Sequence, residues 1–416
     1  MNQTLQDAYN REKKLLPVIL DMERRGVRIS EKIVNVRLQC LEEFDEIDAS
    51  ISSKLGKGSE DIKLGSKKMF SRLEELGLVD HDKITYTDKG NPRYGRAFLP
   101  DIITDEKLAD YLILRGKLQK VIGTYINPWH KSFVEHRGYF FPYYNQVRSV
   151  DNMGTRTGRL SSNLQQIPKK PTDVSIPNMR KFIVPDAGQV LLQRDFSAQE
   201  VRIAAHYAEG TLLEAFIENP ALDAHAFVKD IMVDNTGMEI ERNLVKTINF
   251  LKLYGGGPKL LAERFGLTVS QARVFFNAYD KALPELKQLD KDVQNMARNQ
   301  PIRTWGGRLY EVEVANISGR LRALYYKMIN VLIQGSAADM TKEAMIRYYY
   351  HPDRHADARI MLSVHDELVV SCPGNCYIDQ MQLLKHCMDD IEGWDVPLLS
   401  DGAIGENFGE LEEWED

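Results

Sequence analysis

Four side chains at a spacing of four residues could hold a nucleoside triphosphate. They are Arg242, Lys246, Phe250 and Tyr254, in the sequence RNLVKTINFLKLYGGG. In a helix such residues form one slowly drifting stripe, ~18 Å long at ~1.5 Å rise per residue. Two cations precede two aromatic rings, an order that suits phosphates at one end and base and sugar at the other. Half-buried surface helices also carry such stripes, so the spacing alone leaves both interpretations open.

Two aspartates stand where predicted β-strands end and could bind a metal ion. Asp195 closes the apolar run VLLQRD, and Asp366 lies at the bend of a hairpin predicted for RIMLSVHDELVVS. A carboxylate at a strand end is well placed for a hard divalent cation. Glu367 would point to the opposite face of an extended chain. Asp366 is therefore the predicted ligand, and Glu367 an auxiliary residue.

The elements around these residues carry their own end signals. Thr236 and Glu239 could form a capping box for the stripe helix, and Gly255 is expected in a left-handed conformation at its end. After Asp195 a helix is expected to begin at Ser197, where Glu200 could close a second capping box. The sequence GGGPK after the stripe helix is not a P-loop, because it lacks the GxxxxGK[ST] spacing and follows a helix instead of a strand.

The N-terminal third is predicted to be helical. Residues 15–55 are expected to form a helical hairpin, and residues 105–134 a long helix. The long helix carries a predicted basic patch of Arg115, Lys117 and Lys120.

A shorter helix between them has an unusual start. Ser66 is its predicted N-cap, and Lys67 and Lys68 occupy the first turn. Lysines there oppose the helix dipole, and a bound phosphate would compensate for them. Two solvated lysines would give the same sequence, so both interpretations stay open.

Composition sets limits on the class of protein. A chain of 416 residues can bury a large core and is expected to form two or three subdomains. It has no apolar run of membrane-spanning length and no apolar signal core at its start, which predicts a soluble cytoplasmic protein without a membrane partner. The net charge of −6 argues weakly against nucleic acid, although a basic groove can sit on an acidic body.

The cysteines do not form a recognised metal template. Cys372 and Cys376 precede His386 and Cys387, a spacing that fits no common zinc site. Reduced structural thiols are expected.

The stripe pattern R-x3-K-x3-F-x3-YG resembles the fingers helix of family A DNA polymerases, the group of bacterial DNA polymerase I. The segments DFSAQE around Asp195 and VHDE around Asp366 resemble motifs A and C of that family, in the proper order. TGRLSS-NLQQIP, a T-x-x-GR stretch at Thr304 to Arg308, and GENF near residue 408 are further matches. The resemblance covers about residues 15–408.

The resemblance implies an α+β fold shaped like a right hand, with an antiparallel-sheet palm, helical fingers and a helical thumb. The expected division is thumb 1–140, first part of the palm 141–209, fingers 210–325 and second part of the palm 326–416.

The resemblance also implies the roles of the site residues. Asp195 and Asp366 would bind two Mg²⁺ ions, for which Mn²⁺ is an expected substitute. Arg242, Lys246 and His225 would neutralise the triphosphate, although an isolated histidine would otherwise be a routine surface residue. The nucleoside contacts would come from Glu200 blocking a ribose 2′-OH, Phe250 packing on sugar and base, and Tyr254 forming the floor of the insertion site.

DNA contacts are implied at several places. Arg159 would reach the minor groove at the primer end, and the thumb tip would touch the DNA backbone through Ser66, Lys67 and Lys68. Asn330 and Gln334, at i and i+4 of a helix predicted over 328–348, could read the minor groove without sequence preference, or could be buried packing amides. The last residue of this set is His365, beside Asp366. Lys327, where the family usually has arginine, is an auxiliary residue.

Two departures from the family pattern leave contacts open. The usual spacer between SS and NLQ is missing, which affects Asn163 and Gln165. Leu251 and Lys252 replace small and apolar residues, and Lys252 could contact phosphate or template or face solvent.

The activity implied is template-directed addition of dNTPs to a primer 3′-OH with release of pyrophosphate. Expected partners are primer-template DNA, dNTPs, and a processivity factor or separate exonuclease; a monomer is expected, in the cytoplasm of a bacterium or phage-infected host. Neither proofreading nor 5′-nuclease activity is expected, because nothing precedes the thumb. The alternatives are a catalytically silent primer-template DNA-binding protein and a single-subunit RNA polymerase, against which Glu200 argues.

Overall fold

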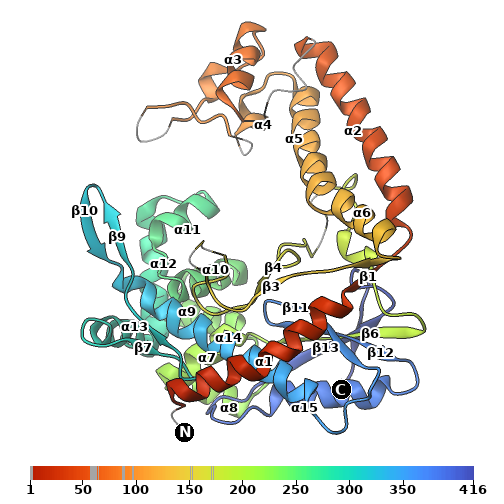
Figure 1. Cartoon of the computed structure of the whole chain (residues 1–416). Coiled ribbons are helices and arrows are strands. Elements are labelled where there is room, and N and C mark those ends of the chain that lie inside the picture. Colours follow the sequence, from red (N-terminus) through yellow and green to blue (C-terminus); the bar gives the residue numbers. More distant parts are fainter. Residues whose placement is uncertain are drawn as a thin grey trace.

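The computed structural model describes residues 3–56, 63, 65–86, 90–95, 98–149, 151, 153–169, 171 and 173–416. Its base is a five-stranded antiparallel sheet in the order β11-β12-β6-β13-β14 (Figure 1). The strands are β6 (Gln189–Phe196), β11 (Arg359–Val364), β12 (Glu367–Pro373), β13 (Ser400–Gly405) and β14 (Glu412–Trp414). The predicted hairpin at residues 359–371 is confirmed as β11 and β12, with its bend at His365 and Asp366.

The sheet separates two hydrophobic cores, because side chains alternate across it. Leu192 of β6 points into a core shared with the helices of the base, and its neighbour Leu191 into a core shared with the helices of the arm. The helices of the base are α1 (Leu5–Arg25), α7 (Gln199–Ala208), α14 (Met328–Tyr349) and α15 (Tyr377–Asp389). The helix predicted over 328–348 is thus confirmed.

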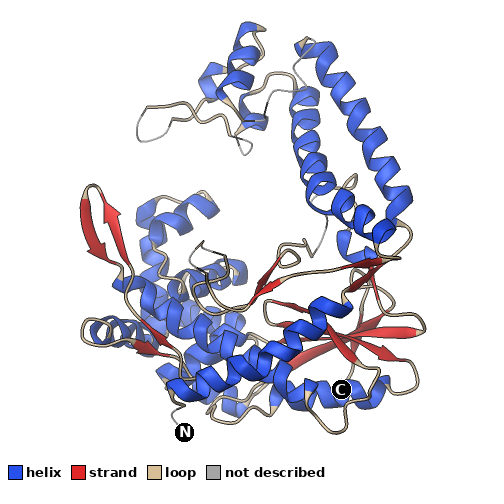
Figure 2. Cartoon of the chain, viewed as in Figure 1, coloured by secondary structure: helices blue, strands red, loops and turns tan. Residues whose placement is uncertain are grey.

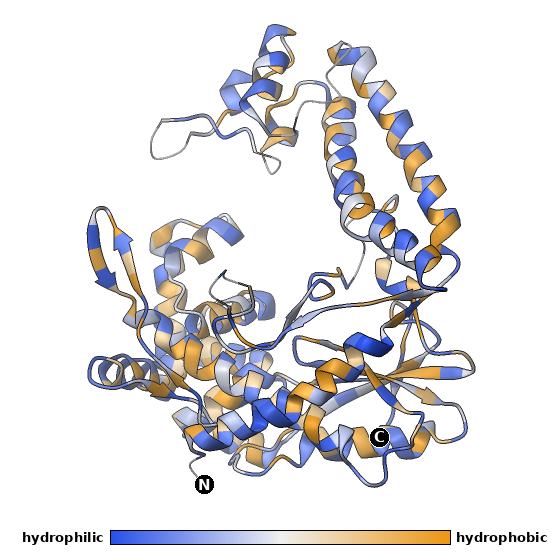
Figure 3. Ribbon diagram, in the orientation of Figure 1, coloured by the Kyte–Doolittle hydropathy of each residue, from blue (hydrophilic) through white to orange (hydrophobic). Residues whose placement is uncertain are grey.

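An arm rises from the base, and hydrophobic and hydrophilic residues alternate along its helices (Figure 3). It consists of α2 (Ile33–Leu55), α3 (Lys67–Glu75), the short α4 (Leu99–Ile102), α5 (Glu106–Val121) and α6 (Asn127–Glu135), with a π-helical turn at Ile122–Ile126. At the foot of the arm, β1 (Val27–Ile29), β2 (Tyr139–Phe140) and β5 (Ile183–Val184) form a small sheet. Nearer the middle of the molecule, β3 (Tyr144–Asn145) pairs with β4 (Ser161–Ser162) (Figure 1).

A block of helices stands on the same side of the base, opposite the arm (Figure 1). It consists of α9 (Ala224–Thr236), α10 (Arg242–Leu253), α11 (Pro258–Phe265), α12 (Val269–Ala282) and α13 (Pro284–Met296), reached through α8 (Thr211–Glu218). Four short strands follow: β7 (Ile302–Arg303), β8 (Leu309–Tyr310), β9 (Val314–Ile317) and β10 (Arg320–Ala323). The β9–β10 hairpin projects away from the rest of the molecule (Figure 2). Helices and an antiparallel sheet in these positions confirm the predicted α+β class.

Of three local predictions about the N-terminal third, two are wrong and one is confirmed. Residues 15–55 do not form a helical hairpin, because α1 lies along α14 in the base while α2 packs on α5 in the arm. The predicted basic patch is wrong for Arg115, which is buried, forms an ion pair with Asp48 and lies over the ring of Phe44. Ser66 is confirmed as an N-cap, since its hydroxyl accepts a hydrogen bond from Met69 N at 3.2 Å.

Neither capping box predicted near the site is formed. The Thr236 hydroxyl donates to the carbonyl oxygen of Met232 at 2.6 Å, which places it at the end of α9, and Glu241 is the N-cap of α10. Likewise α7 begins after Ala198, a left-handed residue at φ +49°, so Ser197 lies one residue too early for a box with Glu200.

Gly255 has the predicted left-handed conformation, at φ +70°. A Cβ there would lie 2.5 Å from the carbonyl oxygen of Tyr326, so glycine also permits the close approach of α10 to the segment before α14.

Among the described residues, no helix combines the length and the apolar character needed to cross a lipid bilayer.

Candidate active site

A cavity of about 650 Å³ lies where the end of β6 meets α7 and α10. It brings together most of the predicted site residues from segments far apart in the sequence. Its lining consists of Arg159, residues 197–201 and 221–225, Arg242, Lys246, Phe250, Tyr254, His365 and Asp366. The catalytic, nucleotide-binding and primer-end residues predicted from sequence therefore share one chamber, except for Asp195, which lies at its edge on β6.

The sheet register places three acidic residues next to one another in the backbone. Asp195 on β6 is directly opposite Glu367 on β12, and the backbone N–H of Phe196 donates to the carbonyl oxygen of Asp366 at 3.3 Å. Burial, followed by the charges of Asp366 and Glu367, raises the pKa of Asp195 to about 7. Lys169 reduces this shift, with its ammonium 3.5 Å from Asp195 Oδ2. Negative charge is therefore concentrated at the end of β6.

Glu367 is held by neighbours instead of projecting into the cavity. Its carboxylate accepts hydrogen bonds from Arg180 at 3.2 Å and from Gln193 at 2.6 Å, and the residue is 2% exposed. Burial, with a contribution from Asp366, still raises the pKa of Glu367. The auxiliary role predicted for Glu367 agrees with this position, although it stays a prediction.

Asp195 and Asp366 fit the kind of magnesium site in which the substrate supplies some of the oxygen ligands. Asp195 Oδ1 is buried and has no hydrogen-bond partner among the residues that the structure describes. Within the same residues, no three His, Cys, Asp or Glu side chains converge as a complete ligand set. Mg²⁺ is usually bound through one or two carboxylates plus water and phosphate oxygens. Asp195 and Asp366 could hold such an ion, with Glu367 behind them.

The predicted stripe is present on α10. Arg242, Lys246, Phe250 and Tyr254 all line the cavity, and the rings of Phe250 and Tyr254 lie with centroids 5.8 Å apart. The Arg242 guanidinium forms an ion pair with Asp223 at 2.7 Å. Of the two cations on the stripe, Arg242 is therefore paired, and Lys246 is exposed one turn further along α10.

His225 is neither a surface residue nor a source of positive charge. It is 8% exposed, and Nδ1 lies 2.6 Å from the side-chain amide nitrogen of Asn249, whose oxygen accepts from the Tyr279 hydroxyl. Burial, and then the charge of Arg242, lowers the pKa of His225 to about 4. The imidazole is neutral at pH 7, accepts at Nδ1, and so carries its proton on Nε2. Its expected role changes from neutralising phosphate to donating one hydrogen bond.

Glu200 is buried at the centre of the polar contacts on the cavity wall. Its Oε1 accepts from Arg159 and, at 3.4 Å, from Gln334. The neighbouring Tyr254 hydroxyl has a raised pKa, first because of burial and then because of the Glu200 charge. Glu200 therefore connects the primer-end residue Arg159, the floor residue Tyr254 and α14.

The remaining predicted DNA contacts lie on α14 and on α3, and the auxiliary residue Lys327 directly precedes α14. Asn330 is half-buried one turn before Gln334 on α14, and Lys327, just before this helix, pairs with Glu313 at 3.3 Å. Lys67 and Lys68 are exposed on α3 at the far end of the arm, away from the cavity (Figure 1).

Two contacts left open by the sequence are now defined. Gln165 holds the β11–β12 bend, since its amide donates to Ser363 O at 3.0 Å and its oxygen accepts from His365 N at 3.0 Å. Lys252 neither faces solvent nor reaches toward the cavity. It pairs with Asp280 and lies 5.0 Å from the ring centroid of Phe276 within the helical block.

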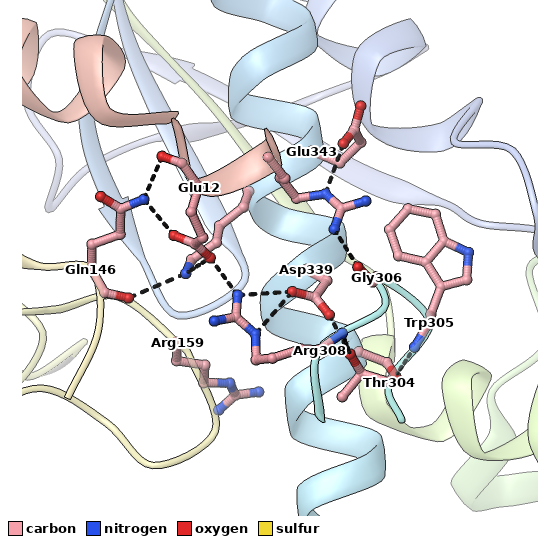
Figure 4. Close-up of polar contacts among 12 residues, drawn as sticks. Glu12, Gln146, Arg159, Thr304, Trp305, Gly306, Arg308, Asp339 and Glu343 are labelled. Carbon is pink, nitrogen blue, oxygen red and sulfur yellow. Dashed lines mark hydrogen bonds and ion pairs between the residues drawn. The ribbon is translucent and has the colours of Figure 1, made fainter. Parts of the chain in front are cut away.

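A buried ionic network behind the site escaped the sequence analysis (Figure 4). Asp339 of α14 is fully buried and accepts from Thr304 at 2.6 Å and from Arg308 at 3.0 Å. Arg308 also pairs with Glu12 of α1, which accepts from Lys342 at 2.7 Å. No sequence motif indicates these pairs, because their members come from three distant segments.

The network also supports the primer-end loop. A Cβ at Gly158 would lie 2.9 Å from Arg308 Cζ, so the loop that carries Arg159 rests directly on the guanidinium of Arg308. Figure 4 shows Arg159 near Arg308. The positions of Arg159 and α14 are therefore linked through Arg308.

The chain is similar to several bacterial DNA polymerases I. The curated relatives include the thermostable DNA polymerase I of Thermus filiformis, 26% identical over 97% of this chain and 48% of that protein. They also include the DNA polymerase I of Pseudomonas aeruginosa, 28% identical over 96% of this chain and 44% of that protein. The chain thus spans about half the length of these relatives.

A solved structure matches the fold. The POL domain of Pol1 from M. smegmatis, in complex with DNA primer-template and dNTP, superposes with a TM-score of 0.78 at 25% identity. The match covers 96% of this chain and 70% of that one. The sequence model of DNA polymerase family A matches residues 30–410. The chain therefore belongs to DNA polymerase family A.

Proposed function

We propose that the chain is a DNA-directed DNA polymerase that adds dNTPs to a primer 3′-OH and releases pyrophosphate. The observation that carries the proposal is the single cavity. Two cations, a hydrogen-bond donor, two aromatic rings and the carboxylate of Asp366 line it, with Asp195 next to Asp366 at the end of β6, and these are the parts of a nucleotidyl-transfer site. Primer-template DNA and dNTP accompany the M. smegmatis POL domain, which supports the same partners here.

The residues of α10 and α9 would position the incoming nucleotide. Arg242 and Lys246 would contact phosphate oxygens, where guanidinium and ammonium groups form charge-assisted bonds. His225 would donate from Nε2 to the triphosphate. Phe250 would pack on the sugar and base, and Tyr254 would form the floor of the insertion site.

Asp195 and Asp366 would hold two Mg²⁺ ions, or Mn²⁺ in their place. When bound, such ions lower the pKa of an attacking hydroxyl and stabilise charge on the leaving pyrophosphate. Oδ1 of Asp195 is buried and has no hydrogen-bond partner among the described residues, which favours a bound cation. A further positive charge nearby would keep this carboxylate fully ionised at neutral pH.

Glu200 would close the site against ribonucleotides. It is held in place by Arg159 and Gln334, so it cannot turn away without breaking these contacts. A rigid carboxylate beside the sugar would collide with a 2′-OH. This argues for dNTPs over rNTPs, and thus against the RNA polymerase alternative.

The rest of the molecule would hold DNA. The arm would act as a thumb (1–140, in which α1 is a lead-in that lies along α14 in the base), the helical block as fingers (210–325) and the sheet with its helices as the palm (141–209 and 326–416). Arg159, Asn330, Gln334 and His365 would contact the primer terminus and the minor groove, and α3 would contact the backbone further along the duplex.

Primer extension tests the proposal. A primed template is incubated with Mg²⁺ and either dNTPs or rNTPs, beside an Asp366→Asn control. Extension with dNTPs alone, lost in the control, is expected. Tight primer-template binding without extension would contradict the proposal and favour a catalytically silent DNA-binding protein. A mismatched primer incubated without dNTPs is expected to keep its length.

A further inference from the structure

Two cysteines meet at a turn that the proposed function does not use. Cys372 lies near the end of β12, and Cys376 is the N-cap residue of α15. Their Sγ atoms are 3.6 Å apart, which is van der Waals contact. All four cysteines of the chain are free thiols, and the other two, Cys40 and Cys387, are buried. The turn therefore brings two oxidisable groups within reach of each other.

The turn between the two cysteines holds both sulfurs around one carbonyl oxygen. The backbone N–H of Cys376 donates to the carbonyl oxygen of Pro373 at 3.2 Å. The same oxygen lies 3.4 Å from the Cys372 sulfur and 3.5 Å from the Cys376 sulfur. At the tip, Gly374 and Asn375 are exposed, and a Cβ on Gly374 would have no heavy atom of the described chain within 4 Å beyond its neighbours. A small reagent can therefore approach the turn from solvent.

A metal site is the alternative role for a pair of cysteines. Protein zinc sites use four protein ligands where they are structural and three where they are catalytic. In the part of the chain that the structure describes, no third His, Cys, Asp or Glu side chain converges with this pair. The geometry therefore favours a bond between the two sulfurs over a shared metal ion.

The two thiols differ in exposure, which gives them different roles in forming such a bond. Cys376 is half-buried, whereas Cys372 is 0% exposed. Burial, followed by the hydrogen bond with Cys376, raises the pKa of Cys372. The thiolate is the reacting form of cysteine, so the accessible Cys376 would meet an external reagent first. Cys372 would react second, with its neighbour.

We propose that Cys372 and Cys376 are a redox modification site, which a low-molecular-weight disulfide oxidises to a reversible intramolecular disulfide. Cys376 Sγ loses its proton and attacks one sulfur of the reagent, whose S–S bond breaks and releases one small thiolate. Cys372 Sγ then loses its proton and attacks Cys376 Sγ, which releases the second small thiolate. Two electrons pass from the protein to the reagent, and the two protons convert the released thiolates to thiols.

The bond would join the end of β12 to the start of α15 without reaching the candidate active site. The sulfurs must approach by ~1.6 Å to reach the ~2.05 Å of a disulfide bond, a movement that the exposed turn can supply. Cys372 is five residues along β12 from Glu367, or ~17 Å at ~3.4 Å per residue. Stability should therefore depend on redox state, while the carboxylates at the other end of the strand keep their positions.

Thiol counting on the full chain tests the proposal. The protein is incubated with oxidised glutathione, unfolded, alkylated and cleaved with trypsin, which leaves residues 360–385 as one peptide. That peptide contains Cys372 and Cys376 and neither of the other two cysteines. It is expected to lose two hydrogen atoms and both alkylation sites, and dithiothreitol should restore both.

Single variants separate the roles of the two thiols. Cys372→Ser removes the second thiol and should leave Cys376 linked to one glutathione. Cys376→Ser removes the accessible thiol and should leave Cys372 unmodified. Cys387→Ser is the matched control, because burial raises the pKa of Cys387 to about 11 and this thiol should take no part. The control variant should oxidise as the unchanged chain does.

Thermal unfolding measures the connection between β12 and α15. The disulfide should raise the melting temperature by about 2–3 °C, because closing a five-residue loop removes ~7 cal/mol/K from the entropy of the unfolded chain, against ~2.1 cal/mol/K per residue on unfolding. The rise should be absent from Cys372→Ser and Cys376→Ser.

The proposal is overturned if both thiols of the peptide stay free, or if Cys376 keeps a glutathione while Cys372 is intact, since no bond then forms between them. It is also overturned if oxidation does not raise the melting temperature, since the bond would then form only by distorting the turn. The thiol count does not depend on polymerase activity, so its outcome is independent of the primer-extension test.

Discussion

The buried network behind the active site predicts that Glu12→Gln destabilises the protein. Glu12 is the anion that faces two cations, Arg308 and Lys342. The Lys342 side chain is 1% exposed, and burial, followed by the Arg308 charge, lowers its pKa to about 8. Glutamine keeps the shape and one acceptor but removes the charge that keeps the buried ammonium ionised.

The expected cost follows from these contacts. Removing one partner of a buried ion pair costs ~3–5 kcal/mol, and the retained acceptor recovers ~1 kcal/mol, which leaves about 3 kcal/mol. Unfolding entropy of ~2.1 cal/mol/K per residue gives ~0.9 kcal/mol/K for 416 residues, so the melting temperature should fall by about 3 °C.

The pH dependence gives a second signature. The pKa of Lys342 is lower in the folded chain than in the unfolded one, so the unfolded chain binds more protons and stability rises with pH from about 8 toward 10.5. Loss of the Glu12 charge lowers the folded pKa further. The difference in stability between the two proteins should therefore be largest near pH 7 and shrink by pH 9.

Thermal unfolding at pH 7, 8 and 9 provides the measurement. Glu75→Gln is the matched control, because its partner Arg72 lies in a surface pair with 37% and 63% exposed side chains, where less than ~1 kcal/mol is expected. Equal melting temperatures for the two variants, or a difference that grows with pH, would refute the reasoning.

Four further predictions concern the site. Phe250→Tyr should raise dideoxynucleotide incorporation at least about tenfold, equivalent to ~1.4 kcal/mol, and unchanged chain termination would count against the placement of this ring. Glu200→Ala should reduce discrimination against rNTPs by about 10- to 200-fold in single-nucleotide insertion; undiminished selectivity would exclude Glu200 as the barrier. Affinity of the DNA-free protein for Mn²⁺, followed by electron paramagnetic resonance, should rise with pH up to about 7 and then level off, because Asp195 must lose its proton; a flat profile would oppose this. Lys252→Met should lower the melting temperature by only about 1–2 °C, because Asp280 still has Lys287 as a partner at 3.2 Å, and it should leave dNTP affinity unchanged. Weaker dNTP binding by this variant would mean that Lys252 contacts a phosphate after all.

Much of the candidate site could be predicted because its chemistry depends on local periodicity. The spacing of four places Arg242 to Tyr254 on one face of α10, and the hairpin pattern places Asp366 at its bend. Such signals need only the chain within one element. The family resemblance added the pairing of Asp195 with Asp366, which no local pattern could supply.

The failures share a cause in tertiary contacts. His225 was expected to be charged, but its burial and the Asn249 contact make it neutral. Lys252 was expected near phosphate or solvent, yet Asp280 lies within reach on another helix. In each case a partner distant in sequence decides the state of the side chain.

The β9–β10 hairpin was missed for a different reason. Its alternation and its Ser318-Gly319 turn are typical hairpin signals. The family resemblance implies helical fingers over residues 210–325, which include this segment, and that expectation conflicts with the local hairpin signal.

The strand order of the sheet has a consequence for biosynthesis. Both neighbours of β6 come from much later in the chain, β12 from residues 367–373 and β13 from residues 400–405. From residue 196 to residue 405 the ribosome must add 209 residues, which takes about 10–40 s at ~5–20 residues per second. For that time at least one edge of β6 is unpaired in the nascent chain, which is a hazard for aggregation and a target for chaperones. Asp195 cannot meet Asp366 until residue 366 has been added, so the nascent chain gains its candidate metal site late in translation.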